Sequence, residues 1–131
     1  MTKIRRKGVA IVDTSKGIVV VSGRSKHFML PGGGAEKWES RKKAAIRELY
    51  EETNLKTKKI TYLFSYIGNK WHTFKGNSIK NYAKVFLVKA EGIAKPKHEI
   101  KYIDYWKPNS KIHITSGTQK VIEKYLTEFK K

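Results

Sequence analysis

The chain has 131 residues, enough for one hydrophobic core, and its 29 Lys and Arg outnumber its 11 Asp and Glu to give a formal net charge of +18. The absence of cysteine excludes disulfides and thiolate metal sites, and no apolar run reaches the roughly 18 residues of a membrane span. We therefore expect a single domain over residues 1–131 of a cytoplasmic protein with no signal peptide and no membrane partner. The charge favours phosphate-rich partners, with small phosphorylated compounds ahead of nucleic acid because the lysines are spread along the whole chain.

The first half of the chain predicts strands followed by a helix. Residues 7–14 and 17–23 are β-branched runs joined by a short turn, which is typical of a hairpin. Residues 27–30 (HFML) predict a third short strand that ends at Pro31 and three glycines. From Ser40, a candidate N-cap, to about Thr53 the apolar residues recur at helical spacing.

The second half predicts more strands and a terminal helix. Residues 58–68 and 81–92 are expected as strands, with 69–80 as a long polar and aromatic hairpin loop, and 101–108 as a further strand stopped by a proline. Residues 115–131 form an amphipathic helical pattern. The order predicts a mixed α/β fold, an α/β/α sandwich with a helix on each face of a mixed sheet.

Three of the few acids of this basic chain fall on one stripe of the first predicted helix. Glu48, Glu51 and Glu52 stand at i, i+3 and i+4, where like charges weaken an isolated helix. Carboxylates that converge in this way suit a hard divalent cation such as Mg²⁺, which prefers oxygen ligands. The neighbouring Arg47 has the fixed fork of donors that orients a carboxylate, and Glu39 in the preceding loop can fold back towards the cluster.

The longer segment GGAEKWESRKKAAIRELYEETNL, residues 33–55, resembles the Nudix box, G-x5-E-x7-R-E-U-x-E-E-x-G-U with U aliphatic. Gly33, Glu39, Arg47, the three helical glutamates and the aliphatic positions are in register. One position departs from the pattern, because Asn54 replaces the second glycine. That glycine follows the helix end, where a left-handed residue is common, and asparagine is the best substitute at positive φ.

The resemblance implies the metal ligands and the catalytic residues. Glu48, Glu51, Glu52 and Glu39 would hold Mg²⁺ or Mn²⁺, with the backbone carbonyl of Gly33 or Gly32 contributing. Members of the family often take a further carboxylate from outside the box, for which Glu99 is the first candidate and Glu91 the second. Glu48, Glu51 or Glu99 would serve as general base, with Arg47 as an orienting catalytic residue.

Four further side chains, and the backbone of Gly32, are candidates for substrate binding. Arg24 and His27 precede the glycines and could contact a substrate phosphate, and Trp71 and Phe74 in the predicted hairpin loop could stack on a base. For both aromatic residues, packing against the core or within the loop is the alternative role.

The expected activity is that of a MutT-like Nudix hydrolase, in which water cleaves a phosphoanhydride of a nucleoside diphosphate linked to another group. A nucleoside triphosphate, standard or oxidised, suits the short chain. The high positive charge keeps open diadenosine polyphosphates and diphosphoinositol polyphosphates, and a protein that acts on or binds RNA 5′ ends is the competing class. A monomer and a homodimer are both compatible with the sequence.

Overall fold

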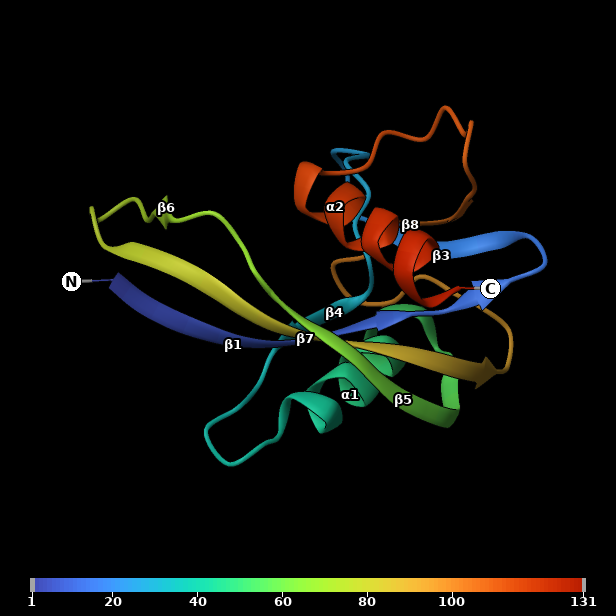
Figure 1. Cartoon of the computed structure of the whole chain (residues 1–131), viewed down its shortest axis with the longest axis horizontal. Coiled ribbons are helices and arrows are strands. Elements are labelled where there is room, and N and C mark those ends of the chain that lie inside the picture. Colours follow the sequence, from blue (N-terminus) through green and yellow to red (C-terminus); the bar gives the residue numbers. More distant parts are fainter. Residues whose placement is uncertain (1, 131) are drawn as a thin grey trace.

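The computed structural model describes residues 2–130 as two β-sheets between two helices (Figure 1). The larger, mixed sheet has the order β4-β1-β7-β5, with β6 paired to β7 beyond the end of β5. Its strands are β1 (Thr2–Ile11), β4 (Gly32–Gly34), β5 (Lys56–Ile67), β6 (Trp71–His72) and β7 (Ser78–Glu91). The smaller antiparallel sheet consists of β2 (Asp13–Thr14), β3 (Gly17–Ser22) and β8 (Tyr102–Trp106).

The two helices cover opposite faces of the sheets. Helix α1 (Arg41–Thr53) packs on one face, where Ala45 and Leu49 join a buried cluster with Phe86 of β7. Helix α2 (Ser116–Lys124), which continues as a π-helical turn over Tyr125–Phe129, packs on the other face. These two cores confirm the predicted α/β/α arrangement. None of the helices in residues 2–130 is long and apolar enough to cross a membrane.

The first strands differ from the prediction in extent and pairing. The predicted strand over 7–14 is divided at Val12, so that β1 belongs to the large sheet and β2 to the small one, where β2 pairs with β3 around the expected turn. Strand β1 also begins at Thr2, because the basic residues before Lys7 pair in parallel with the start of β7. This pairing depends on a distant strand, so the local sequence does not show it.

Two further segments correct the prediction. The segment HFML is not a strand: Phe28 and Met29 make only isolated bridges, to Ile114 and Val21. The glycines after it form β4 instead, because their backbone can lie closely against β1. Residues 69–80 are not wholly a loop, since they include β6 and the first residues of β7.

The ends of α1 confirm the sequence interpretation. The Ser40 hydroxyl accepts a hydrogen bond from the Lys43 backbone N–H at 3.1 Å, which is the N-cap arrangement. Asn54 has φ 66°, in the left-handed region, and its backbone N–H donates to the Tyr50 carbonyl at 2.9 Å. The asparagine therefore supplies the backbone conformation for which glycine is usually selected.

Gly8 determines how closely α1 can approach the sheet. A Cβ at this position would lie 2.0 Å from the Arg41 carbonyl oxygen and 2.6 Å from the Ala45 nitrogen, both backbone atoms of α1. We expect Gly8→Ala to lower the free energy of unfolding by about 3 kcal/mol or more, because the helix must move as a whole. Chemical denaturation measures this, with Gly117→Ala as the control. There the nearest atom is 3.9 Å away, and an equal loss in both variants would contradict the assignment.

Candidate active site

Arg47 is the centre of an ion-pair network on the exposed side of α1. Its guanidinium donates to Glu39 through Nε and Nη2, both at 2.8 Å, to Glu48 through Nη1 at 2.7 Å, and to Glu51 at 3.2 Å. It also reaches the Gly34 carbonyl at 3.2 Å. The bidentate bond from Arg47 lowers the pKa of Glu39 to about 2, and its carboxylates together raise the pKa of Arg47. The network fixes the loop that carries Glu39 against the helix.

Glu52 is the buried carboxylate of the cluster. It is 8% exposed, and its Oε1 accepts a hydrogen bond from the Gly32 backbone N–H of β4 at 3.0 Å. Burial raises the pKa of Glu52 to about 8, and the nearby charges of Glu48 and Glu99 add to the rise. The side chain thus carries a proton near neutral pH unless a cation stabilises its charge.

Glu48 lies beside Glu52, against the glycine strand. Burial raises the pKa of Glu48, while its bond to Arg47 opposes the rise. A Cβ on Gly33 would lie 2.4 Å from the Glu48 Oε2 atom, so the glycine makes room for this carboxylate. Glu99, exposed in the segment before β8, also acts electrostatically on Glu48 and Glu52. The structure therefore brings Glu99 towards the helical carboxylates from a distant part of the chain.

The sequence interpretation missed a lysine that interacts electrostatically with the same cluster. Lys7 of β1 is half-buried, and burial lowers its pKa while the negative charges of Glu52 and Glu48 raise it. Arg5, two residues earlier on the same face of β1, lies within about 4 Å of the position that a Cβ of Gly34 would occupy. The alternation of Arg5, Lys7 and Val9 along a strand could have indicated that Lys7 shares a face with Arg5 and Val9. That inference required knowing that β1 starts before Lys7.

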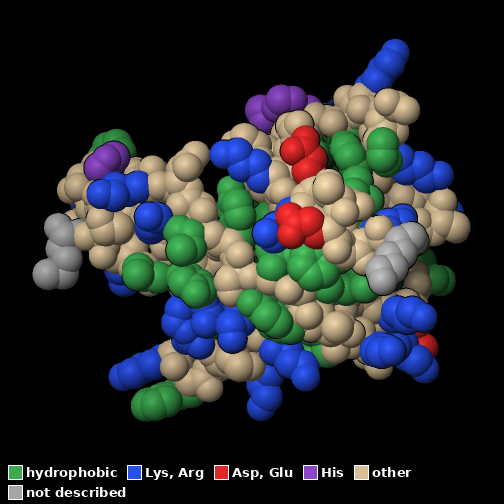
Figure 2. Space-filling model, viewed as in Figure 1, with side chains coloured by type: hydrophobic (Ala, Val, Ile, Leu, Met, Phe, Trp, Pro, Cys, Tyr) green, Lys and Arg blue, Asp and Glu red, His purple; other side chains and the backbone are tan. Residues whose placement is uncertain are grey.

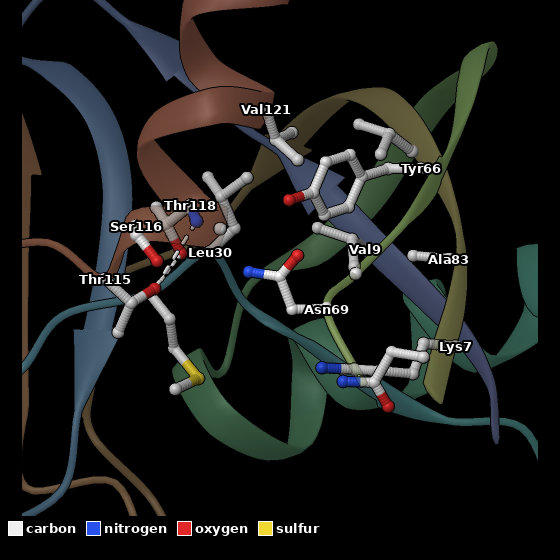
Figure 3. Close-up of a pocket in the computed structure, with 15 residues that line it drawn as sticks. Lys7, Val9, Leu30, Tyr66, Asn69, Ala83, Thr115, Ser116, Thr118 and Val121 are labelled. Atoms are coloured by element: carbon white, nitrogen blue, oxygen red, sulfur yellow. Dashed lines mark hydrogen bonds between the residues drawn. The ribbon is translucent and has the colours of Figure 1, made fainter. Parts of the chain in front are cut away.

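A pocket of about 330 Å³ opens beside Lys7, between the large sheet and the start of α2. Figure 3 shows Lys7 at one side of it and the Thr115–Thr118 turn at the opposite side, with the side chain of Asn69 between them and the Tyr66 ring beside Val121. The Thr115 hydroxyl donates to that of Thr118 at 2.8 Å. Apolar walls come from β1 and β7 through Val9, Ala83 and Val85, from α2 through Val121, and from the segment before β4 through Leu30.

One lining side chain is left without a partner. The Asn81 Oδ1 atom is buried and has no hydrogen-bond partner in the structure. A buried acceptor without a donor is costly, and a ligand that brings an N–H group would remove the cost. The pocket is therefore polar at a few points and apolar elsewhere, as small-molecule sites usually are.

The other predicted site residues do not line the pocket. Arg24 and His27 are exposed in the segment between β3 and β4, where the His27 ring packs edge-on against His113 at 4.7 Å. Trp71 and Phe74 belong to the hairpin of β6 and β7 and do not line the pocket. Glu91, the second candidate for an outside carboxylate, instead lies 3.6 Å from Lys58 at the end of β7.

The carboxylate oxygens of this cluster are of the kind that binds a hard divalent cation. Within residues 2–130 no three His, Asp or Glu side chains stand in a ready-made metal arrangement, since Arg47 engages the oxygens of Glu39, Glu48 and Glu51. The buried Glu52 and its neighbour Glu48, however, both have raised pKa values and need a cation to remain ionised together. Carboxylate oxygens beside a glycine backbone are ligands that Mg²⁺ and Mn²⁺ accept.

The fold and the acidic helix behind a glycine strand are those of a family of hydrolases. The sequence profile of the NUDIX domain family matches residues 3–125, and the chain belongs to this family of metal-dependent hydrolases. No curated protein matches the chain significantly.

Solved structures agree with this membership. A Nudix hydrolase family member from Chromobacterium violaceum is similar at 30% identity and a TM-score of 0.76, covering 95% of this chain and 77% of that one. The MutT Nudix hydrolase from Burkholderia pseudomallei has 19% identity and a TM-score of 0.70, with 92% and 97% of the two chains covered. A bifunctional NMN adenylyltransferase/ADP ribose pyrophosphatase from Francisella tularensis, complexed with AMP and a Mn ion, has 18% identity and a TM-score of 0.68, covering 96% of this chain and 42% of that one. The last two show the fold alone.

Proposed function

We propose that the chain hydrolyses a phosphoanhydride bond of a nucleoside triphosphate, standard or oxidised. The proposal is supported chiefly by Lys7, which lines the pocket and interacts electrostatically with Glu52 and Glu48. A phosphate chain beside Lys7 would extend from the carboxylate cluster into the pocket, where the nucleoside would lie. The two sites that such a substrate needs are thus adjacent.

The pocket suits a base better than an inositol ring. Its apolar walls match the faces of a base, and the amide of Asn81 can accept a hydrogen bond from a ring or exocyclic N–H group. Among the described residues that line the pocket, Lys7 is the sole charged side chain. A diphosphoinositol polyphosphate carries phosphates around its whole ring and would need more cations there. This pattern favours the nucleotide over the inositol alternative.

Each part of the site has a role in the proposed reaction. A bound Mg²⁺ or Mn²⁺ would polarise a phosphoryl oxygen and make water easier to deprotonate. Glu52 and Glu48 would hold the ion, with Glu51, Glu39 and the carbonyl of Gly32 or Gly33 completing the oxygen ligands. One of Glu48, Glu51 and Glu99 would accept the proton of the attacking water. Arg47 would keep the helical and loop carboxylates in place through its hydrogen bonds.

A substrate panel tests the proposal. Nucleoside triphosphates, oxidised dGTP, diadenosine polyphosphates, ADP-ribose and a diphosphoinositol polyphosphate would be assayed with Mg²⁺, with Mn²⁺ and with EDTA. We expect a nucleoside monophosphate and pyrophosphate from a triphosphate, and no turnover in EDTA. Some of the similar structures are ADP-ribose pyrophosphatases. A preference for ADP-ribose or for the inositol compound would overturn the assigned substrate.

Lys7→Met should raise KM for the triphosphate by about 10- to 100-fold, because a charge-assisted contact to phosphate is worth about 1.5–3 kcal/mol. Methionine keeps most of the apolar length of the side chain, so the fold should persist. Steady-state kinetics measure the effect. The control is Lys89→Met, which removes the same charge at an exposed position of β7. Equal KM values for Lys7→Met and the parent would show that Lys7 does not contact the substrate.

A further inference from the structure

A β-ribbon extends from the body of the protein on the side away from β3 and β8 (Figure 1). We call it the arm and define it as residues 2–6 and 67–82. In it β1 pairs in parallel with β7, from Thr2 opposite Ser78 to Arg6 opposite Tyr82. On the other side of β7, Trp71 and His72 of β6 pair antiparallel with Ile79 and Ser78. Neither α1 nor α2 lies over the outer part of this ribbon in Figure 1.

The arm is exclusively cationic among its charged residues. The sequence has no Asp or Glu between Met1 and Val12 or between Thr53 and Ala90, a span that includes the whole arm. In Figure 2 the arm, at the left, shows blue Lys and Arg side chains, whereas the red acidic side chains in this view lie on the body. The cations of the arm are Lys3, Arg5, Arg6, Lys70, Lys75 and Lys80.

Two large aromatic side chains are exposed among these cations. Phe74, at the tip of the β6–β7 hairpin, is 107% exposed, and Trp71 is 41% exposed. The tip is held in shape by Thr73, whose backbone N–H donates to the Asn77 carbonyl at 2.8 Å and whose hydroxyl accepts from the Asn77 N–H at 3.1 Å. The hairpin thus presents two aromatic rings to solvent, and their burial by a partner would be favourable.

The register places Lys3, Arg5 and Trp71 on one face of the ribbon. Lys3 is opposite Ile79 and Arg5 opposite Asn81, and Trp71 is opposite Ile79 from the other side, so these side chains share a face by strand alternation. The same face continues along β1 to Lys7 at the pocket. The arm therefore offers a row of positive charge with an aromatic ring at its outer end.

We propose that the arm binds single-stranded nucleic acid, with Trp71 and Phe74 stacked on bases and the arm cations on phosphates. Proteins that bind single strands without sequence preference combine a positively charged groove for the phosphates with exposed aromatic rings on which the bases stack. A second copy of this chain fits less well as the occupant, because two arms brought together would each contribute only positive charge. A polyanion with exposed π faces satisfies both the charges and the rings.

Fluorescence anisotropy with labelled oligouridylate and oligothymidylate of about 12 nucleotides tests the proposal. EDTA keeps hydrolysis out of the measurement. We expect the double variant Trp71→Ala/Phe74→Ala to bind at least about 10-fold more weakly, since stacking on each base is worth about 1–3 kcal/mol. The matched control is Trp38→Ala, which removes an aromatic ring that is 90% exposed but lies outside the arm. Thermal unfolding would verify that each variant is folded.

The salt dependence tests the cations separately. Between about 50 and 200 mM salt, Lys70→Ser/Lys75→Ser should reduce the slope of log K against log salt by about 1.4, because each phosphate contact with a single strand contributes about 0.7. Lys111→Ser/Lys120→Ser, with the same change in net charge on exposed residues outside the arm, should leave the slope unchanged.

Three results would overturn the proposal. The first is that neither oligonucleotide binds at low salt. The second is that the arm and control variants lose equal affinity, or that a duplex of the same length binds as tightly as the single strand. The third is that the chain sediments as a dimer which Trp71→Ala/Phe74→Ala dissociates, since the arm would then be a self-association surface.

Discussion

Glu52→Gln should lower kcat/KM for the hydrolysed nucleotide by about three orders of magnitude at pH 8, equivalent to roughly 4 kcal/mol of transition-state stabilisation. Glutamine keeps the oxygen that accepts the Gly32 N–H, so the local structure should persist. It cannot carry the negative charge that holds a cation. The loss should therefore appear in activity without loss of fold, measured by initial rates in Mg²⁺ and by circular dichroism.

The control for this substitution is Glu123→Gln on α2, which also removes one carboxylate. Glu123 is exposed, its Oε1 accepts a hydrogen bond from the Gln119 side chain on the same helix at 3.0 Å, and its replacement should leave kcat/KM unchanged. If Glu52→Gln retained a rate within about a factor of ten of the parent in saturating Mg²⁺, Glu52 would not be an essential ligand.

The same substitution should stabilise the metal-free protein at alkaline pH. The pKa of Glu52 rises from 4.5 to about 8 on folding, so between these values the folded state binds more protons than the unfolded state. Its contribution to stability is fully present below pH 4.5 and is lost as the pH rises towards 8 and above. Since each pKa unit is worth about 1.36 kcal/mol, Glu52→Gln should gain about 5 kcal/mol over the parent at pH 9 and almost nothing at pH 4.

Thermal unfolding in EDTA as a function of pH measures this gain. About 5 kcal/mol corresponds to about 15 °C or more in Tm for a chain of this size. Glu51→Gln, at a carboxylate whose side chain is 42% exposed, should show a much smaller difference between pH 4 and pH 9. A parent and a Glu52→Gln variant with the same Tm at every pH would mean that the carboxylate is not buried as the structure places it.

The acidic helix could be predicted from the sequence because its information is local. The caps Ser40 and Asn54 and the spacing of the glutamates lie within one short segment, and each residue acts on neighbours three or four positions away. The same holds for the apolar faces of α1 and α2, which indicated one helix on each side of a sheet. The structure confirms these elements together with the fold class.

The strand pairing could not be predicted because it joins distant segments. The basic residues of β1 before Lys7 have little hydrophobic alternation and become a strand only through pairing with β7. The glycines of β4 have low strand preference, yet close backbone contact with Gly8 places them in the sheet. Where a strand is stabilised by its neighbour and not by its own side chains, periodicity gives no signal.

The candidate site shows the same division. Glu48, Glu51, Glu52, Arg47 and Glu39 follow from one motif, and the structure brings them together. Lys7, Asn81 and the turn at Thr115 come from three other parts of the chain, and only the fold places them at the pocket. Arg24, His27, Trp71 and Phe74 remain predictions for substrate binding, although the structure puts them outside the pocket lining.

Mn²⁺ titration of the metal-free protein tests whether Glu52 and its neighbours form the proposed cation site. In weakly buffered solution at pH 7, Mn²⁺ binding should release close to one proton, because Glu52, with a pKa of about 8, must ionise to bind the metal. Glu52→Gln should bind Mn²⁺ far more weakly and release no such proton. Equal affinity and equal proton release in the parent and in Glu52→Gln would contradict the account.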